Sequence, residues 1–65
     1  MRGKIVIIKY DKKSRTAAFY NAGGWVYSVD EAQDFGDENS AIDTAKEINE
    51  HDCIIAVAEY KQQNQ

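Results

Sequence analysis

The chain lacks several residues on which common architectures and sites depend. It has no proline, one cysteine, one histidine and four glycines among 65 residues. Cys53 has no second cysteine for an internal disulfide, and a small domain without disulfides fits a reducing compartment. A single histidine and a single cysteine exclude a structural zinc site, which takes four such ligands. The absence of proline and the scarcity of glycine also exclude a low-complexity chain.

Long apolar runs are also missing. No run approaches the roughly 20 residues of a transmembrane helix, and the apolar segment after Met1–Lys4 is too short for a signal peptide. We therefore predict a cytoplasmic protein without membrane contact. The hydrophobic fraction of 43% is that of a folded chain. We expect one domain, residues 1–65, that buries about 60% of its unfolded surface and therefore acts through its surface.

Three short segments in the first half of the chain predict strands. Lys4–Tyr10 is rich in β-branched residues, and a polar loop at Asp11–Ser14 separates it from a second strand, Arg15–Tyr20. Asn21–Gly24 is the clearest turn signal, and it precedes a third strand over Trp25–Val29.

The second half predicts a helix and a last strand. Ser28 and Glu31 have the spacing of a capping box, which predicts a short helical turn. Apolar residues at helical spacing predict the main helix over about Ser40–Glu50, with Asp37, Asn39 and Ser40 as candidate caps. Cys53–Tyr60 is almost wholly apolar, so we expect a strand that is central or flanked on both edges. The result is an α+β fold: an antiparallel sheet of three to four strands with one main helix on one face.

Large aromatic side chains are expected to supply much of the core of so small a domain. We predict core positions for Trp25, Tyr27 and Phe35, and partial exposure for Tyr10, Tyr20 and Tyr60.

The charges are divided between the two parts of the chain. Residues 1–27 hold six basic residues and one acid, whereas residues 28–65 hold ten acids and two lysines. Such asymmetry is informative about partners. The candidate partner-binding residues are the acids near the two helix starts and along the main helix: Asp30, Glu31, Asp34, Asp37, Glu38, Asp43, Glu47 and Glu50.

Two interpretations of these acids stay open. They can keep a small protein soluble and cap its helices, or they can form a negative surface for a basic groove that normally holds nucleic acid. The acids lack the spaced oxygen ligands of a calcium loop, so no metal is predicted. The basic first hairpin, with Lys4, Lys9, Lys12, Lys13 and Arg15, is the alternative binding surface, for nucleic acid. The net charge of −3 opposes that second idea.

No catalytic site is predicted. His51, Asp52 and Cys53 are consecutive, but catalytic cysteine and histidine residues normally meet through the fold rather than through adjacency. We expect His51 near a helix C-terminus and Cys53 as a small hydrophobe opening a strand. Gly23–Gly24 lacks the spacing of a phosphate loop. We therefore predict a protein that is not an enzyme and that has no cofactor.

A spaced set of positions carries a family resemblance. The set comprises Gly24, Trp25, Asp30, Ala32, Phe35, Ala41 and Ala45. It resembles small proteins of bacteriophages and other mobile elements in which a hairpin ends in a Gly-Trp strand, a turn with alanine and phenylalanine follows, and an alanine-spaced helix precedes a last apolar strand. The resemblance spans about Lys4–Tyr60 and implies the β-β-α-β fold. In size, acidity and lack of a catalytic motif the chain is also similar to anti-CRISPR proteins, some of which mimic DNA.

These observations lead to three functional hypotheses. The first is an acidic phage-type binding protein that inhibits a host nucleic-acid-handling complex by occluding its basic surface, as an anti-CRISPR protein or DNA mimic in the host cytoplasm. The second is a nucleic-acid-binding accessory protein that uses the basic hairpin. The third is a structural or self-associating phage protein that uses an exposed edge strand. We expect a monomer or weak homodimer.

Overall fold

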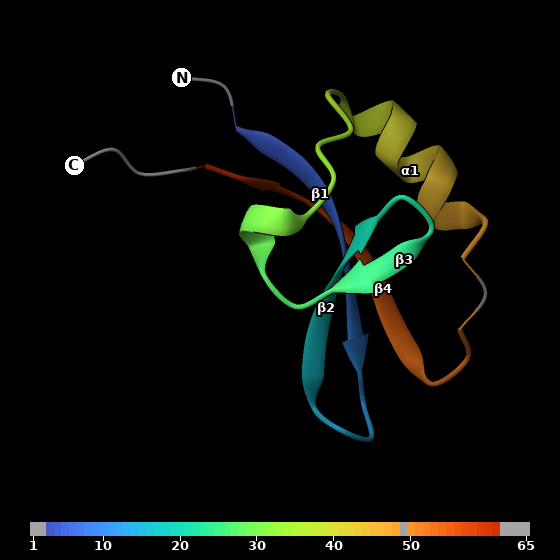
Figure 1. Ribbon diagram of the computed structural model, residues 1–65. Helices are drawn as coiled ribbons and strands as arrows, with labels where there is room; N and C mark the ends of the chain where they lie inside the picture. The colour runs from blue at the N-terminus through green and yellow to red at the C-terminus, as the bar shows by residue number, and fades with distance from the viewer. Residues whose placement is uncertain (1–2, 49, 62–65) are drawn as a thin grey trace.

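A computed structural model describes residues 3–48 and 50–61 of the chain (Figure 1). Its elements, in order, are β1 (Lys4–Asp11), β2 (Thr16–Asn21), β3 (Gly24–Val26), a short 3₁₀ turn η1 (Val29–Glu31), α1 (Glu38–Lys46) and β4 (Cys53–Tyr60). The predicted α+β class is confirmed, because a four-stranded antiparallel sheet carries one helix. Arg2, counted above among the basic residues, lies outside the described residues.

The order of strands in the sheet is β3-β2-β1-β4. The prediction that the last strand is central was wrong: β4 pairs with β1 along its full length and forms one edge of the sheet. The apolar composition of β4 led to the wrong prediction because its two faces differ in burial. Ile55 and Val57 are half-buried, whereas Ile54 is 52% exposed.

The tight turn between β2 and β3 is built as the sequence predicts. Asn21 pairs with Gly24, leaving Ala22 and Gly23 as a two-residue loop with φ values of 50° and 88°. Positive φ at both positions is the geometry whose twist matches that of the flanking strands. Gly23 adopts it without strain, because it has no Cβ.

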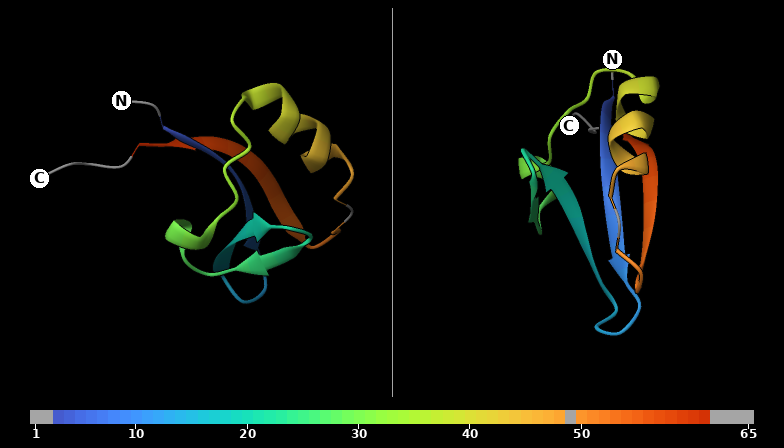
Figure 2. Two further views of the ribbon diagram at one scale, coloured as in Figure 1. Left: turned by 45° about the horizontal axis from the view of Figure 1, so that its top comes forward. Right: turned by 90° about the vertical axis from the view of Figure 1, so that its right-hand side faces the viewer.

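Strands β1 and β2 separate along their length. They pair only where Ile8–Asp11 of β1 meets Thr16–Phe19 of β2. The other half of β1 pairs with β4 alone. Figure 2 (right) shows the result: the β2–β3 arm leans away from the β1–β4 arm, so the two open like a V.

The segment that follows η1 bridges this opening. The Gln33 amide donates to the Tyr20 carbonyl of β2 (2.9 Å), and the Phe35 amide donates to the Ile5 carbonyl of β1 (3.0 Å). The Ile5 amide in turn donates to Oδ1 of Asp34 (3.2 Å). Main-chain groups that strand pairing leaves open are therefore satisfied by three consecutive residues of a connecting segment.

The core lies between the sheet and α1 and continues under η1. Ile7 and Val6 are the largest fully buried side chains, at 0% and 1% exposure. Successive residues of β1 point to opposite faces, so these two neighbours serve both sides of the sheet. Ala41 of α1 is fully buried, and the helix packs across β1 and β4. Small side chains at the contact let the helix approach closely.

The helix begins and ends earlier than predicted. Asp37 is the N-cap: its carboxylate accepts from the Ser40 amide at 2.7 Å, so the helix starts at Glu38 rather than Ser40. It ends at Lys46, four residues before the predicted Glu50. The amides of the next residues close short turns onto carbonyls three residues back instead of continuing the α-helix.

None of the three aromatic residues predicted for the core is fully buried. Trp25 and Phe35 are half-buried, and both rings lie against Tyr20, with centroids at 5.6 Å and 5.8 Å. Tyr27 is 78% exposed, so its core prediction was wrong. The third strand ends at Val26 rather than Val29, and this early end releases the next residue from the sheet.

The isoleucine burial makes a direct stability prediction. Ile7→Val should lower the free energy of unfolding by about 0.5–1.5 kcal/mol, because it removes one methylene from a filled site. Ile54→Val makes the same chemical change at an exposed site and should stay within about 0.5 kcal/mol of wild type. Urea unfolding of dilute protein measures both. Equal losses would show that the two side chains are buried alike.

Candidate partner-binding surface

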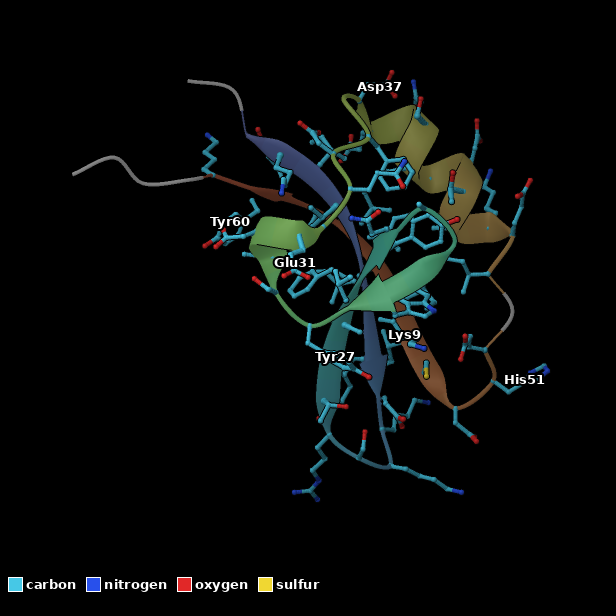
Figure 3. All side chains as sticks on the ribbon, in the orientation of Figure 1. Lys9, Tyr27, Glu31, Asp37, His51 and Tyr60 are labelled. Atoms are coloured by element: carbon cyan, nitrogen blue, oxygen red, sulfur yellow. The ribbon has the colours of Figure 1, made fainter. Side chains whose placement is uncertain are left out.

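The eight predicted acids follow one continuous stretch of chain across the molecule. Two lie in or beside η1, two in the segment that leads to α1, three in or next to the helix, and one in the loop before β4. Figure 3 labels Glu31 on η1 and Asp37 at the start of α1. The structure thus places the acids along η1, α1 and their links. It also gives three of them local tasks.

Asp34 holds the bridge between the two arms of the sheet. Its Oδ1 accepts from the Ile5 amide of β1 at 3.2 Å and from the Gly36 amide at 2.9 Å. Gly36 has φ of 82°, a conformation that glycine adopts freely. The carboxylate therefore ties the start of β1 to the sharp turn that leads into α1.

Asp37 stabilises the start of the helix. The Ser40 amide, followed by the Ser40 hydroxyl, donates to its carboxylate and lowers the pKa of Asp37 below its ordinary value of 3.8. A negative charge at this end is also favoured by the helix dipole. Asp37 therefore stabilises the fold whether or not a partner is bound.

Glu50 lies beside a lysine of the sheet. Its carboxylate is 3.5 Å from Lys9 Nζ, which also stands 4.4 Å from the centre of the Trp25 ring. The Lys9 side chain is only 17% exposed. One cation thus joins the loop before β4 to the aromatic side chains on the helix-facing side of the sheet, through an ion pair and a cation–π contact.

Five acids remain with no ion-pair partner among the described residues, and we call them the open carboxylates: Asp30, Glu31, Glu38, Asp43 and Glu47. All five residues are exposed. Asp43 and Glu47 stand one helical turn apart, where like charges repel by a few tenths of a kcal/mol. An opposite charge from outside would relieve this repulsion.

The basic hairpin offers fewer free cations to a partner than its sequence suggests. Lys4 donates to the carbonyls of Val29 and Asp30, at 3.0 Å and 3.2 Å, and so anchors η1. Lys9 is occupied with Glu50 and Trp25. The exposed cations left on the hairpin are those of the turn between β1 and β2: Lys12, Lys13 and Arg15.

The same turn is shaped by an acid. Oδ1 of Asp11 accepts from the amides of Lys13 (2.9 Å) and Ser14. These bonds, with the Lys13 amide first, lower the pKa of Asp11. Arg15 then takes φ of 59°, so the three exposed cations sit on a turn that Asp11 organises.

No side-chain hydrogen bond joins the consecutive His51, Asp52 and Cys53 in the described part of the chain. His51 lies in an exposed turn, and the helix ends well before it, so its predicted place at a helix C-terminus was wrong. Desolvation, followed by the nearby Asp11 charge, raises the pKa of Cys53 and keeps the thiol protonated. Within residues 3–48 and 50–61, no three acids, histidines or cysteines are grouped to hold a metal. No described helix is long and apolar enough to cross a membrane.

Comparison of the chain with protein-family models, with curated proteins and with solved structures finds no match. The resemblance to small phage proteins therefore stays a prediction, and the function is argued from the geometry alone.

One surface was missed by sequence reasoning. The outer edge of β4 and its exposed Ile54 and Ala56 were taken for sheet interior, whereas partial exposure was predicted for Tyr60. The single charge within this strand, Glu59, was the available signal, and one acid in eight residues is too little to identify an edge.

The bridge at Asp34 can be tested by a pair of substitutions. Asp34→Ala removes the acceptor for the Ile5 and Gly36 amides and should cost on the order of 1 kcal/mol of unfolding free energy. Asp34→Asn keeps one acceptor oxygen and should cost clearly less. Thermal unfolding of the two variants checks this. Equal losses would mean that charge, rather than the acceptor oxygen, carries the effect.

The Asp37 cap should give a pH-dependent contribution. Its folded pKa lies below the unfolded value, so the stabilisation is present above about pH 3.8 and is lost as the pH falls through the folded pKa. Asp37→Ala should lower Tm at neutral pH, whereas Asp37→Ser keeps an uncharged cap and most of the stability. The Tm gap between wild type and Asp37→Ser should shrink below pH 3.8. Asp11 titrates in the same window in both proteins, so it cancels in that difference.

Proposed function

We propose that this chain is a non-catalytic binding protein whose open carboxylates occupy a basic, nucleic-acid-binding surface of a partner. Inhibition of a host nucleic-acid-handling complex, with an RNA-guided nuclease as the leading example, is the corresponding role. The carrying observation is that five exposed acids along η1 and α1 have no ion pair within the described residues. Carboxylates in this state interact with a cationic surface without first losing an internal partner.

The distribution of charge supports an oriented encounter. The open carboxylates lie on η1 and α1, whereas the three exposed cations sit on the β1–β2 turn, which lies away from α1 in Figure 1. A basic groove would attract the first region and repel the second, so the field would turn the protein before contact. Occlusion would then follow from the bulk of a rigid domain.

A nucleic-acid-binding role has one observation in its favour. Lys12, Lys13 and Arg15 are exposed, and no described acid forms an ion pair with them. Three phosphate contacts are few, and the net charge of −3 opposes approach to a polyanion. Direct binding to DNA or RNA is therefore the second candidate.

The open carboxylates can be tested by reversing three of them. A panel of RNA-guided nuclease complexes is first screened for those whose target-DNA cleavage the wild type inhibits. Against these, the variant Asp30→Lys, Asp43→Lys, Glu47→Lys should inhibit cleavage at least tenfold more weakly than the wild type. Its Tm should stay within a few degrees, because none of these three side chains makes an ion pair in the fold and lysine suits the last turn of α1. Lys12→Glu with Lys13→Glu is the matched control and should inhibit like wild type.

Two results would contradict the proposal. One is unchanged inhibition by the reversed variant. The other is tight binding of the wild type to labelled duplex DNA or single-stranded RNA at low salt, lost in the Lys12→Glu, Lys13→Glu control; this outcome would select the nucleic-acid-binding role. Fluorescence anisotropy measures that binding.

A further inference from the structure

The outer edge of β4 is an open row of main-chain hydrogen-bonding groups. β4 is the last strand in the sheet order, and no described strand pairs with its outer side; at its start the Cys53 amide donates to the Glu50 carbonyl (3.4 Å). In Figure 2 (right) it forms the margin of the molecule beyond β1, with α1 lying over the face of the sheet. An edge of eight regular residues presents donors and acceptors at the spacing that another strand requires.

This edge lacks the features by which proteins usually block strand addition. Those features are short length, proline, bulges and lysine. β4 runs unbroken from Cys53 to Tyr60, and its register with β1 has no bulge. Its one charge is Glu59. The opposite edge differs, since β3 has three residues and begins with Gly24.

We propose that β4 pairs antiparallel with β4 of a second copy of this chain, with Val57 opposite Val57 of that copy. A two-fold axis perpendicular to the sheet keeps each face of the sheet continuous, so only residues of the same face can stand opposite one another. The register then has a limited set of values, two residues apart. Charge selects among them.

In the proposed register, Glu59 and Lys61 each share a row of paired residues, which runs across the strands, with an opposite charge of the second copy. Ile55 pairs with Lys9, and Cys53 pairs with Asp11, within each copy. Glu59 lies opposite Ile55 of the second copy and therefore in the same row as its Lys9. Lys61, which directly follows β4, lies opposite Cys53 and in the same row as Asp11 of that copy.

The two neighbouring registers place like charges in line. A shift of two residues one way puts Glu59 in the row of the second copy's Asp11, so acid faces acid. A shift the other way puts Lys61 in the row of the second copy's Lys9. Charges two strands apart are separated by about 9.5 Å, so they discriminate between registers more than they add affinity.

Apolar rows on the other face support the same register. Ile54 pairs with Tyr10 within the chain, and the proposed register brings Tyr60 of the second copy opposite Ile54. All three are large exposed hydrophobic side chains: Tyr10 is 38% exposed, Ile54 is 52% exposed and Tyr60 is 47% exposed. They would form one row across the junction, where neighbouring aromatic and β-branched side chains stabilise strand pairs. Small Ala56 and Ala58 stand opposite each other beside it.

The inference is independent of the proposed function. The open carboxylates lie on η1 and α1 rather than on the edge of β4. A failure of pairing therefore leaves the inhibition test unaffected, and the reverse also holds.

Sedimentation equilibrium of the full chain tests the pairing. The mass should rise with concentration from 7.4 kDa toward twice that value and stop there, because the β3 edge is too short to continue the sheet. Ala56→Lys puts a charge in the middle of the edge on an exposed position and should shift the half-dimer concentration upward at least tenfold, with Ile54→Lys as a second variant. Tyr27→Lys makes the same change in charge at a distant exposed site and should dimerise like wild type.

A monomer at every concentration would overturn the proposal. This holds even if the edge pairs with a strand of a different protein. Growth beyond a dimer, or unchanged pairing in both β4 variants while Tm shows that they are folded, would also overturn it.

Oxidative cross-linking tests the register. In a Cys53→Ser background, a mixture of Ala56→Cys and Ala58→Cys proteins should cross-link efficiently, because these positions stand opposite each other. Ala56→Cys alone should cross-link poorly, since its two copies are offset along the strands beyond the Cα separation of about 7 Å that a disulfide allows. Efficient cross-linking of Ala56→Cys alone would contradict the register.

Discussion

The bond between the Ile5 amide and the Asp34 carboxylate is the constraint on which the architecture depends. β1 has only β4 beside it along its first half, because β2 turns away beyond Ile8. Without these partners, the main-chain groups on that side of β1 would have only water to bond to. Asp34 and the adjacent amide of Phe35 supply the missing partners, and in doing so they determine where the chain crosses the sheet.

The crossing decides what the rest of the surface becomes. The segment that bridges the arms ends at Gly36, so Asp37 is placed to cap α1 and the helix packs over β1 and β4. The acids of this stretch thereby divide into two groups. Those at the bridge and at the cap hold the fold, whereas the open carboxylates of η1 and α1 face solvent. The helix covers one face of β4 and leaves its outer edge open, so an acidic surface and a free strand edge coexist in one small domain.

Local sequence signals predicted the elements whose causes are themselves local. The β-branched residues of Lys4–Tyr10 and the Asn21–Gly24 turn correspond to observed structure because strand formation and a turn with positive φ depend on neighbouring residues. The helix limits were less accurate, since three residues near its start could serve as caps, and the structure shows that Asp37 is the one whose carboxylate accepts from the Ser40 amide. Tyr27 was misplaced because the end of β3 depends on where η1 packs.

The sequence by itself determined the fold class, the strand segments and the division between basic and acidic parts of the chain, because composition and periodicity are properties of consecutive residues. The tertiary structure decided which charges remain available. Lys4 and Lys9 are engaged with η1 and with Glu50 and Trp25, whereas Asp43 and Glu47 are left without partners in the described chain. It also decided that β4 is an edge. Strand order results from long-range pairing, and an apolar segment reads the same in the centre of a sheet and at its margin.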